Sequence, residues 1–109
     1  MFVRMARFEG ADASTRSERM ARLRQEIEAV IAGQTPDGLP AEAAEVLRSS
    51  VARVLGLVDK DGIEANAVFC ETEEDLRRVD EILSAASPGE GDGQRLDVAH
   101  YEVVLDVHR

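Results

Sequence analysis

VARVLGLVDKDGIEANAVFC, residues 51–70, is the stretch that decides the fold. Two apolar runs flank residues 59–62, whose composition is typical of a tight turn. The stretch therefore predicts a β-hairpin. Because apolar residues occupy both alternating sets of each run, we expect both faces of the resulting sheet to be covered.

The length of the hairpin loop sets which side chains share a face. With a loop of two or four residues, Val58 pairs with Ile63 and Gly56 with Ala65. The face toward the helices then carries Val54, Gly56, Val58, Ala65, Ala67 and Phe69, and the opposite face carries Leu55, Leu57, Asn66, Val68 and Cys70. A loop of odd length with a bulge would change the pairing of these sets.

Outward from the hairpin, the pattern alternates between strands and helices. Thr72 is a good helix N-cap, and the three residues that follow it are acidic, as helix N-termini favour. The apolar stripe after them predicts a helix up to about residue 86. Helical spacing also predicts helices over 14–32 and 41–50, and two-residue alternation predicts strands over 2–9 and 96–109. The order β-α-(α)-β-β-α-β predicts a ferredoxin-like split βαβ fold of the α+β class with an antiparallel sheet, in one domain over 1–109.

Composition excludes several classes of partner. The 109 residues carry a net charge of −9, which argues against nucleic acid and anionic membranes. No stretch approaches the roughly 20 apolar residues of a membrane span. Cys70 is the single cysteine, so no intrachain disulfide forms, which fits a reducing cytoplasm. We expect a cytoplasmic protein without bound metal or cofactor.

The second sheet face predicts a homodimer. Leu55, Leu57 and Val68 lie on it in the register above, and helices are expected on the other side only. Apolar side chains without a covering layer are expected to pack against a partner, and a second copy of the chain is the economical solution.

Four segments carry a family resemblance: MFVRMARFEG at the start, VLGLVDKDG in the hairpin, FCETEEDL after it and AHYEVVLDV in the last strand. They resemble the antibiotic-biosynthesis-monooxygenase-like domain, whose members form dimeric α+β barrels. The resemblance implies a protein that binds an apolar or aromatic small molecule, with cofactor-independent monooxygenase activity as one form of that function. A structural or ligand-sensing dimer of the same fold is the alternative.

The chain departs from the haem-degrading members of that family. Cys70 stands where those relatives have a tryptophan, residues 2–9 contain no asparagine, and residues 72–86 contain no histidine. The resemblance therefore implies that this chain neither holds nor degrades haem. Residues 34–50 are an insertion relative to the family pattern, and they either cap a pocket or pad the surface.

Three side chains are candidates for a ligand site: Asn66, Cys70 and His100. The Asn66 amide can donate to and accept from a ligand, although backbone or water can satisfy it equally well. Cys70 is a nucleophile only if the following helix start lowers its pKa, and otherwise it is a small buried filler. His100 can move protons near neutral pH with Glu102 orienting it, or both can be solvated on an edge strand. No grouping has metal-ligand spacing.

Overall fold

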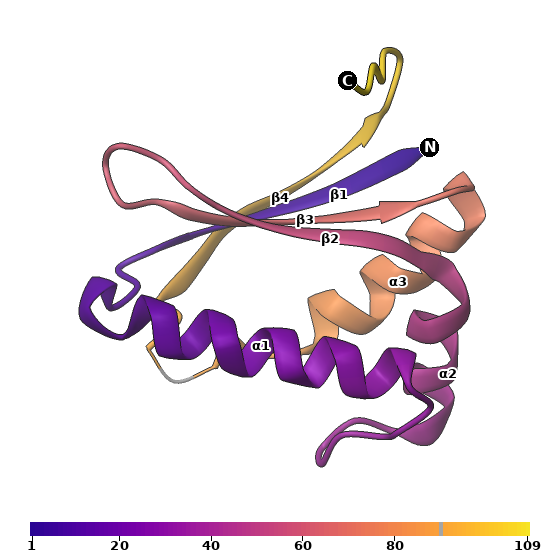
Figure 1. Ribbon diagram of the computed structural model, residues 1–109, viewed down its shortest axis with the longest axis horizontal. Coiled ribbons are helices and arrows are strands. Elements are labelled where there is room, and N and C mark those ends of the chain that lie inside the picture. The colour runs from indigo at the N-terminus through magenta and orange to yellow at the C-terminus, as the bar shows by residue number, and fades with distance from the viewer. Residues whose placement is uncertain (90) are drawn as a thin grey trace.

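The protein forms one antiparallel sheet with its helices on one side. In a computed structural model, which describes residues 1–89 and 91–109, the strand order is β2-β3-β1-β4. The elements are β1 (Phe2–Glu9), the short 3-10 helix η1 (Ala13–Thr15), α1 (Arg16–Ile31), α2 (Ala41–Ser50), β2 (Val51–Val58), β3 (Glu64–Cys70), α3 (Glu73–Ala85) and β4 (Gln94–Glu102). The helices lie below the sheet in Figure 1. The predicted ferredoxin-like α+β fold is confirmed. Residues 87–94, SPGEGDGQ, have a composition that predicts a loop, and residue 90 within them lies outside the described residues.

The β2–β3 hairpin turns through three residues. The backbone N–H of Asp59 donates to the carbonyl of Ile63 at 3.0 Å, which closes a loop over residues 60–62. Gly62 has a φ of 84°, the left-handed conformation that the last position of such a loop requires. The loop of odd length, an alternative left open by the sequence, is therefore the one that forms.

The odd loop shifts the hairpin register by one residue, so the predicted face assignment is wrong. Gly56 pairs with Asn66, and Val54 pairs with Val68. Because side chains alternate along a strand, Asn66, Val68 and Cys70 share one face. That face is the one covered by the helices, since Val68 and Cys70 pack against α3.

We call the side of the sheet without helices the open face. Apolar side chains from all four strands lie on it: Val3, Met5, Leu55, Leu57, Ala65, Ala67, Phe69, Ala99 and Tyr101. Leu57 is 46% exposed and Tyr101 is 55% exposed. The expectation of an apolar second face is right for Leu55 and Leu57 but wrong for Val68, which is buried beneath the helices.

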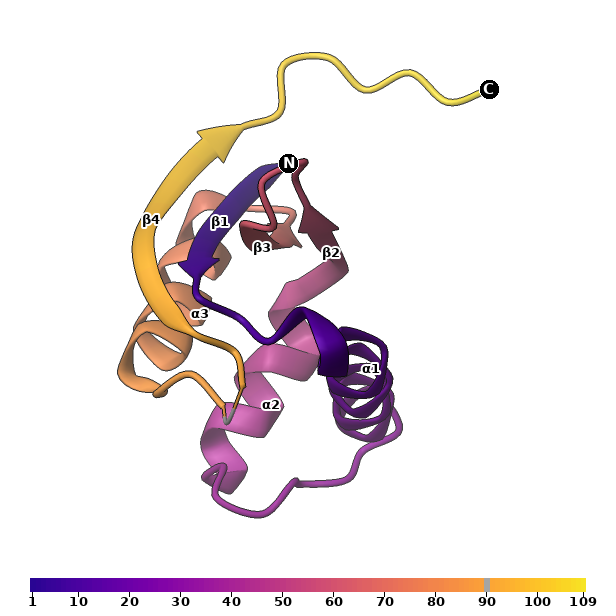
Figure 2. The ribbon, with the colours of Figure 1, turned by 90° about the vertical axis from the view of Figure 1, so that its left-hand side faces the viewer.

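The last strand ends earlier than predicted. β4 stops at Glu102, which pairs with Phe2, the first residue of β1. Beyond that point the backbone N–H of Val103 donates to the carbonyl of Met1 at 2.8 Å, and no strand residue remains for the chain to pair with. Residues 103–109, the tail, extend beyond the sheet on the side away from the helices (Figure 2). Their apolar side chains are 80–88% exposed at Val104, Leu105 and Val107.

Helix α3 forms the core with the sheet. Thr72 caps it as predicted, because its hydroxyl accepts from the backbone N–H of Asp75 at 3.1 Å. Leu76 and Val79 are 2% and 0% exposed and pack with Val68 and Cys70 of β3. The buried stripe predicted for this helix is therefore confirmed at these two positions. Within the described chain, no helix is both long and apolar enough to cross a membrane.

Ion pairs anchor the first turns of helix α1 to the sheet. Its first turns contribute Arg16 and Arg19 to a cluster with Glu64 and Asp92, which we call the Glu64 ion cluster. Arg19 is 4% exposed, and its guanidinium donates to Glu64 at 2.7 Å and to Asp92 at 3.0 Å. The hydrogen bond from Arg19 lowers the pKa of Glu64, against the effect of burial and with help from Arg16.

Candidate functional site

A cleft of about 570 Å³ lies between the helix-covered face of the sheet and helices α1 and α2. Its apolar lining comes from every layer around it: Ala6, Phe8, Val51, Val54 and Val68 from the sheet, Leu23, Ile27, Val30 and Ile31 from α1, Pro36 and Leu39 from the loop, Leu47 from α2 and Leu83 from α3. The polar lining includes Arg4, Glu26, Asp37, Arg48, Arg53 and Asn66. A cleft of this size and composition can hold a small organic molecule.

The cleft exists because α1 does not pack down onto the strands. α1 makes few close contacts with the sheet, and its apolar residues Leu23 and Ile27 are only half-buried. Two of the sheet positions on this face, Ala6 and Gly56, carry little or no side chain. Met20 of α1 comes close to the sheet at Gly56, where a built Cβ would lie 3.4 Å from its sulfur, whereas Ala6 fills little of the space beneath the rest of the helix. Figure 1 shows α1 running below the sheet while α3 lies closer to it.

The insertion over 34–50 caps this cleft. Leu39 and Leu47 contribute apolar lining. Arg48 ties the insertion to α1, because its Nε donates to the carbonyl of Val30 at 2.7 Å and its Nη2 to that of Gln34 at 3.4 Å. The structure therefore favours the first of the two roles left open by the sequence, a cap over a pocket.

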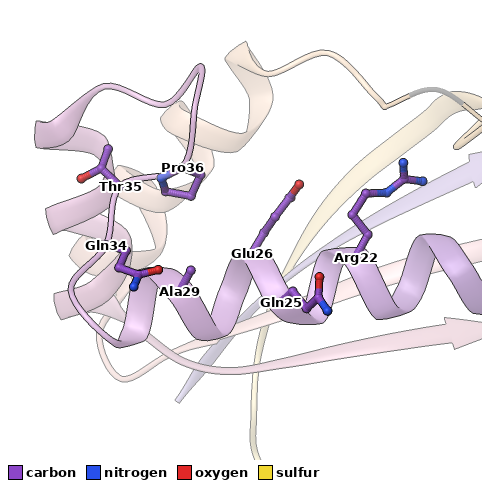
Figure 3. Close-up of a pocket in the computed structure, with 7 residues that line it drawn as sticks. All are labelled: Arg22, Gln25, Glu26, Ala29, Gln34, Thr35 and Pro36. Carbon is purple, nitrogen blue, oxygen red and sulfur yellow. The ribbon is translucent and has the colours of Figure 1, made fainter.

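A second, smaller hollow of about 300 Å³ lies on the outer side of α1 (Figure 3). Its lining is mostly polar: Arg22, Gln25, Glu26 and Ala29 from α1, and Gln34, Thr35 and Pro36 from the following loop. Glu26 and Pro36 line both spaces, so this hollow adjoins the cleft. Because it is shallow and shares its lining with the cleft, we regard it as an outer margin of the cleft rather than the site itself.

Asn66 lies in the cleft, although not for the reason the sequence suggested. Instead of facing a partner sheet, it points to the helix side, paired across the strands with Gly56 and Ala6. Its side-chain amide makes no hydrogen bond to any residue that the structure describes. Asn66 therefore has its donor and acceptor available to a ligand.

Cys70 belongs to the core. It is 0% exposed, packs with Leu76 and Val79, and does not line the cleft. Burial raises the pKa of its thiol, and the negative charge of Asp75 adds to the effect. The helix N-terminus therefore does not activate the thiol. Cys70 is a small buried side chain that fills space in the core, the second of the two roles that the sequence left open.

His100 lies beside the cleft rather than in it. It sits on the edge strand β4 with 42% of its side chain exposed, and its Nε2 is 3.3 Å from the carboxylate of Asp80 on α3. The expected partner Glu102 is on the same face, but the carboxylate that the ring contacts is that of Asp80. His100 is connected to the cleft only through Asp80, which also contacts the lining residue Arg4.

Arg4 is the site residue that sequence reasoning missed. It lines the cleft from β1 while only 3% exposed. The signal was present in the alternation of residues 2–9, where an arginine falls among Phe2, Ala6 and Phe8 on the covered face. An arginine at such a position must find partners or leave the fold unstable. Among the described residues, no group of three or more His, Cys, Asp and Glu is placed to hold a metal ion.

Comparison with known proteins identifies the fold. No model of a known protein family matches the chain, and no curated protein matches it. Among solved structures it is similar to an arginine-to-serine mutant of MhuD, crystallised with two manganese protoporphyrin IX molecules bound per active site. The TM-score is 0.59 and the identity 15%, over 100% of both chains. Identity at this level shows the fold alone, and the chain therefore shares with MhuD its α+β architecture.

Proposed function

We propose that this protein binds an apolar small molecule in the cleft and acts as a homodimer through its open face. The observation that carries the binding function is the cleft of about 570 Å³, lined mainly by apolar side chains with a few polar groups among them. Sites for small organic ligands in proteins typically have this size and composition. The fold shared with MhuD, which was crystallised with porphyrins bound, supports the same class of function.

The side chains at the cleft favour binding over oxygenase chemistry. Its described lining includes no His, Cys or Tyr, and the ionisable side chains on the cleft side are Arg4, Glu26, Asp37 and Arg48. Arg53 also borders the cleft, but its guanidinium lies beside Phe69 on the open face. None of these side-chain types ordinarily titrates near neutral pH, where a general base is most effective. A ligand-sensing or ligand-carrying role therefore fits the cleft better than a cofactor-independent monooxygenase.

The binding function is tested with the neutral fluorescent probe N-phenyl-1-naphthylamine. Wild-type protein should bind it saturably, with one probe per chain. Leu23→Trp places a large ring in the cleft and should weaken binding at least about tenfold, because the cleft volume is then occupied. Arg24→Trp, on the exposed side of the same helix, should bind like the wild type. Binding that does not saturate, or that Leu23→Trp leaves intact, would contradict the proposal.

A second copy of the chain is the occupant that fits the open face. The face has an apolar centre with polar groups at its margins, where Arg7 pairs with Asp97 and the guanidinium of Arg53 lies 5.8 Å from the ring centre of Phe69. This organisation is typical of protein interfaces. A two-fold arrangement would cover the open face of both copies, together with the exposed apolar side chains of the tail. Burying a leucine such as Leu57 contributes roughly 1.5–3 kcal/mol.

Light scattering at micromolar concentration tests the dimer. The wild type should have twice the mass of the chain. Leu57→Asp should give monomers that keep their helical circular dichroism, because the substitution places a charge in the interface and not in the core. Ile31→Asp changes an equally apolar residue, 68% exposed on α1, and should remain dimeric. A monomeric wild type would refute the dimer.

We also propose that the cleft does not take haem. Neither histidine of the chain is among its described lining residues. Titration with hemin should give no tight stoichiometric shift of the Soret band. A sharp shift that His100→Ala abolishes would show that His100 supplies an axial ligand after all.

The cytoplasm is the compartment we propose for this protein. Cys70 is a single, fully buried thiol, and such cysteines are common where glutathione and thioredoxin keep thiols reduced. Fractionation of cells expressing the tagged chain would check this location.

A further inference from the structure

The guanidinium of Arg4 is buried at the cleft with donors to spare. Its Nε donates to the carboxylate of Asp80 at 2.7 Å, and its Nη2 donates to the hydroxyl of Ser84 at 3.2 Å. A guanidinium has five N–H donors, so these two contacts leave three. No acceptor among residues 1–89 and 91–109 takes them. Because Arg4 lines the cleft, these donors are available to its occupant.

The carboxylate of Asp80, which balances the charge of Arg4, lies outside the cleft lining. The Asp80 oxygen that accepts from Arg4 also accepts from the hydroxyl of Ser84 at 3.0 Å and lies 3.3 Å from the ring nitrogen of His100. Burial works to raise the pKa of Asp80, but the hydrogen bonds from these three partners hold it below its usual value. Asp80 itself does not line the cleft. The positive member of the pair therefore faces the cleft, and the negative member does not.

Asn66 lies next to Arg4 on the same face of the sheet. Ala6 pairs with Asn66, and Arg4 pairs with Val68, so Arg4 and Asn66 are diagonal neighbours across β1 and β3. Such neighbours are about 7–8 Å apart between backbones, within reach of one group held by both side chains. Ala6, between them, is too small to fill the space.

The acidic lining residues lie at the mouth. Glu26 and Asp37 are exposed, so water and salt screen their charges. Arg48, the other arginine on this side, already donates to two backbone carbonyls and to Glu45. The cleft is therefore apolar along its length, positive at Arg4 and amide-lined beside it.

We infer that the natural ligand is an apolar molecule carrying one carboxylate, which Arg4 receives with its free N–H donors and Asn66 with its amide. The inference rests on the proposed binding function and narrows its ligand class. Arginine pairs with carboxylates through two parallel hydrogen bonds, and a low-dielectric site strengthens them. The apolar part of such a ligand would pack against the cleft walls, and its carboxylate would accept hydrogen bonds from Arg4.

Two ligands of the same shape test this ligand class. Naphthaleneacetic acid and its primary amide differ only in the charge of one group, and both can be measured by displacement of N-phenyl-1-naphthylamine at pH 8. Wild-type protein should bind the acid about tenfold more tightly than the amide, as expected for one added charged hydrogen-bonding contact. Arg4→Gln should remove that preference by lowering the affinity for the acid to about that for the amide. Arg24→Gln, an exposed arginine remote from the cleft, should keep the preference.

A second variant controls for the possibility that Arg4→Gln unfolds the protein. Arg4→Gln leaves Asp80 without its main partner, so the double variant Arg4→Gln, Asp80→Asn removes both charges together, which buried pairs tolerate better. It should also bind the acid and the amide equally. Equal binding by the wild type, failure of both ligands to displace the probe, or a preference that survives in both Arg4 variants would overturn the inference. Failure of the probe itself to bind would instead overturn the proposed function.

Discussion

Helices α3 and α1 cover the same face of the sheet and do so in different ways. α3 places Leu76 and Val79 directly on β3, where both are almost fully buried. α1 has an apolar stripe of similar composition, yet Leu23 and Ile27 remain half-buried above the cleft. The insertion, which includes α2, lies beside α1 and is joined to it through Arg48. The Glu64 ion cluster holds the first turns of α1 on the sheet. Two amphipathic helices thus produce a core on one side and a site on the other.

The largest expected effect is a difference in the free energy of unfolding between substitutions under α3 and under α1. Leu76→Ala should lower the free energy of unfolding by about 3 kcal/mol, because it leaves a cavity in a packed core. Leu23→Ala should cost only about 1 kcal/mol, since its side chain already borders open space. Urea denaturation followed by circular dichroism measures both. Equal losses would mean that α1 is packed as tightly as α3.

The ion cluster that holds α1 comes next. Glu64→Gln should cost about 3 kcal/mol at pH 7, because Arg19 is buried and loses its main charged partner. Glu28→Gln breaks the exposed pair with Arg24 and should change stability by no more than about 0.5 kcal/mol. If the two variants unfold at the same urea concentration, the cluster does not anchor α1.

Adding a large ring to each half sharpens the comparison. Cys70→Trp puts the ring into the core under α3 and should cost about 2 kcal/mol through overpacking. Leu23→Trp puts the same ring into the cleft and should cost less than half of that, because there is room for it. Thermal denaturation of both variants decides the matter. A well-tolerated tryptophan at position 70 would show that unfilled space exists beneath α3.

Acid should weaken the Glu64 ion cluster that holds α1. The pKa of Glu64 is lowered in the folded protein, so its contribution to stability is complete above the ordinary glutamate pKa of about 4.3 and is lost as the pH falls through the folded value. The stability difference between wild type and Glu64→Gln should therefore be constant above about pH 5 and shrink below pH 4. A difference that grows toward low pH would contradict the direction of the pKa shift.

The hairpin shows where sequence reasoning succeeds and where it stops. The turn residues and the two apolar runs predicted β2 and β3 correctly, because local composition determines them. Whether the loop has two, three or four residues depends on small conformational differences, and one residue exchanges the two faces of the strand. Asn66 consequently entered the candidate site for the wrong reason, and Cys70, assigned with it to the partner-facing side, lies in the core.

The sequence by itself determined the α+β class, the order of the elements and the caps and stripes of α3, because these depend on neighbours along the chain. Only the tertiary structure decided that α1 stands away from the sheet, that the insertion caps a cleft, and that Arg4 lies within it next to Asn66. These features depend on register and on how three helices share one sheet face. They come from contacts between residues far apart in the chain, for which one sequence carries no local signal.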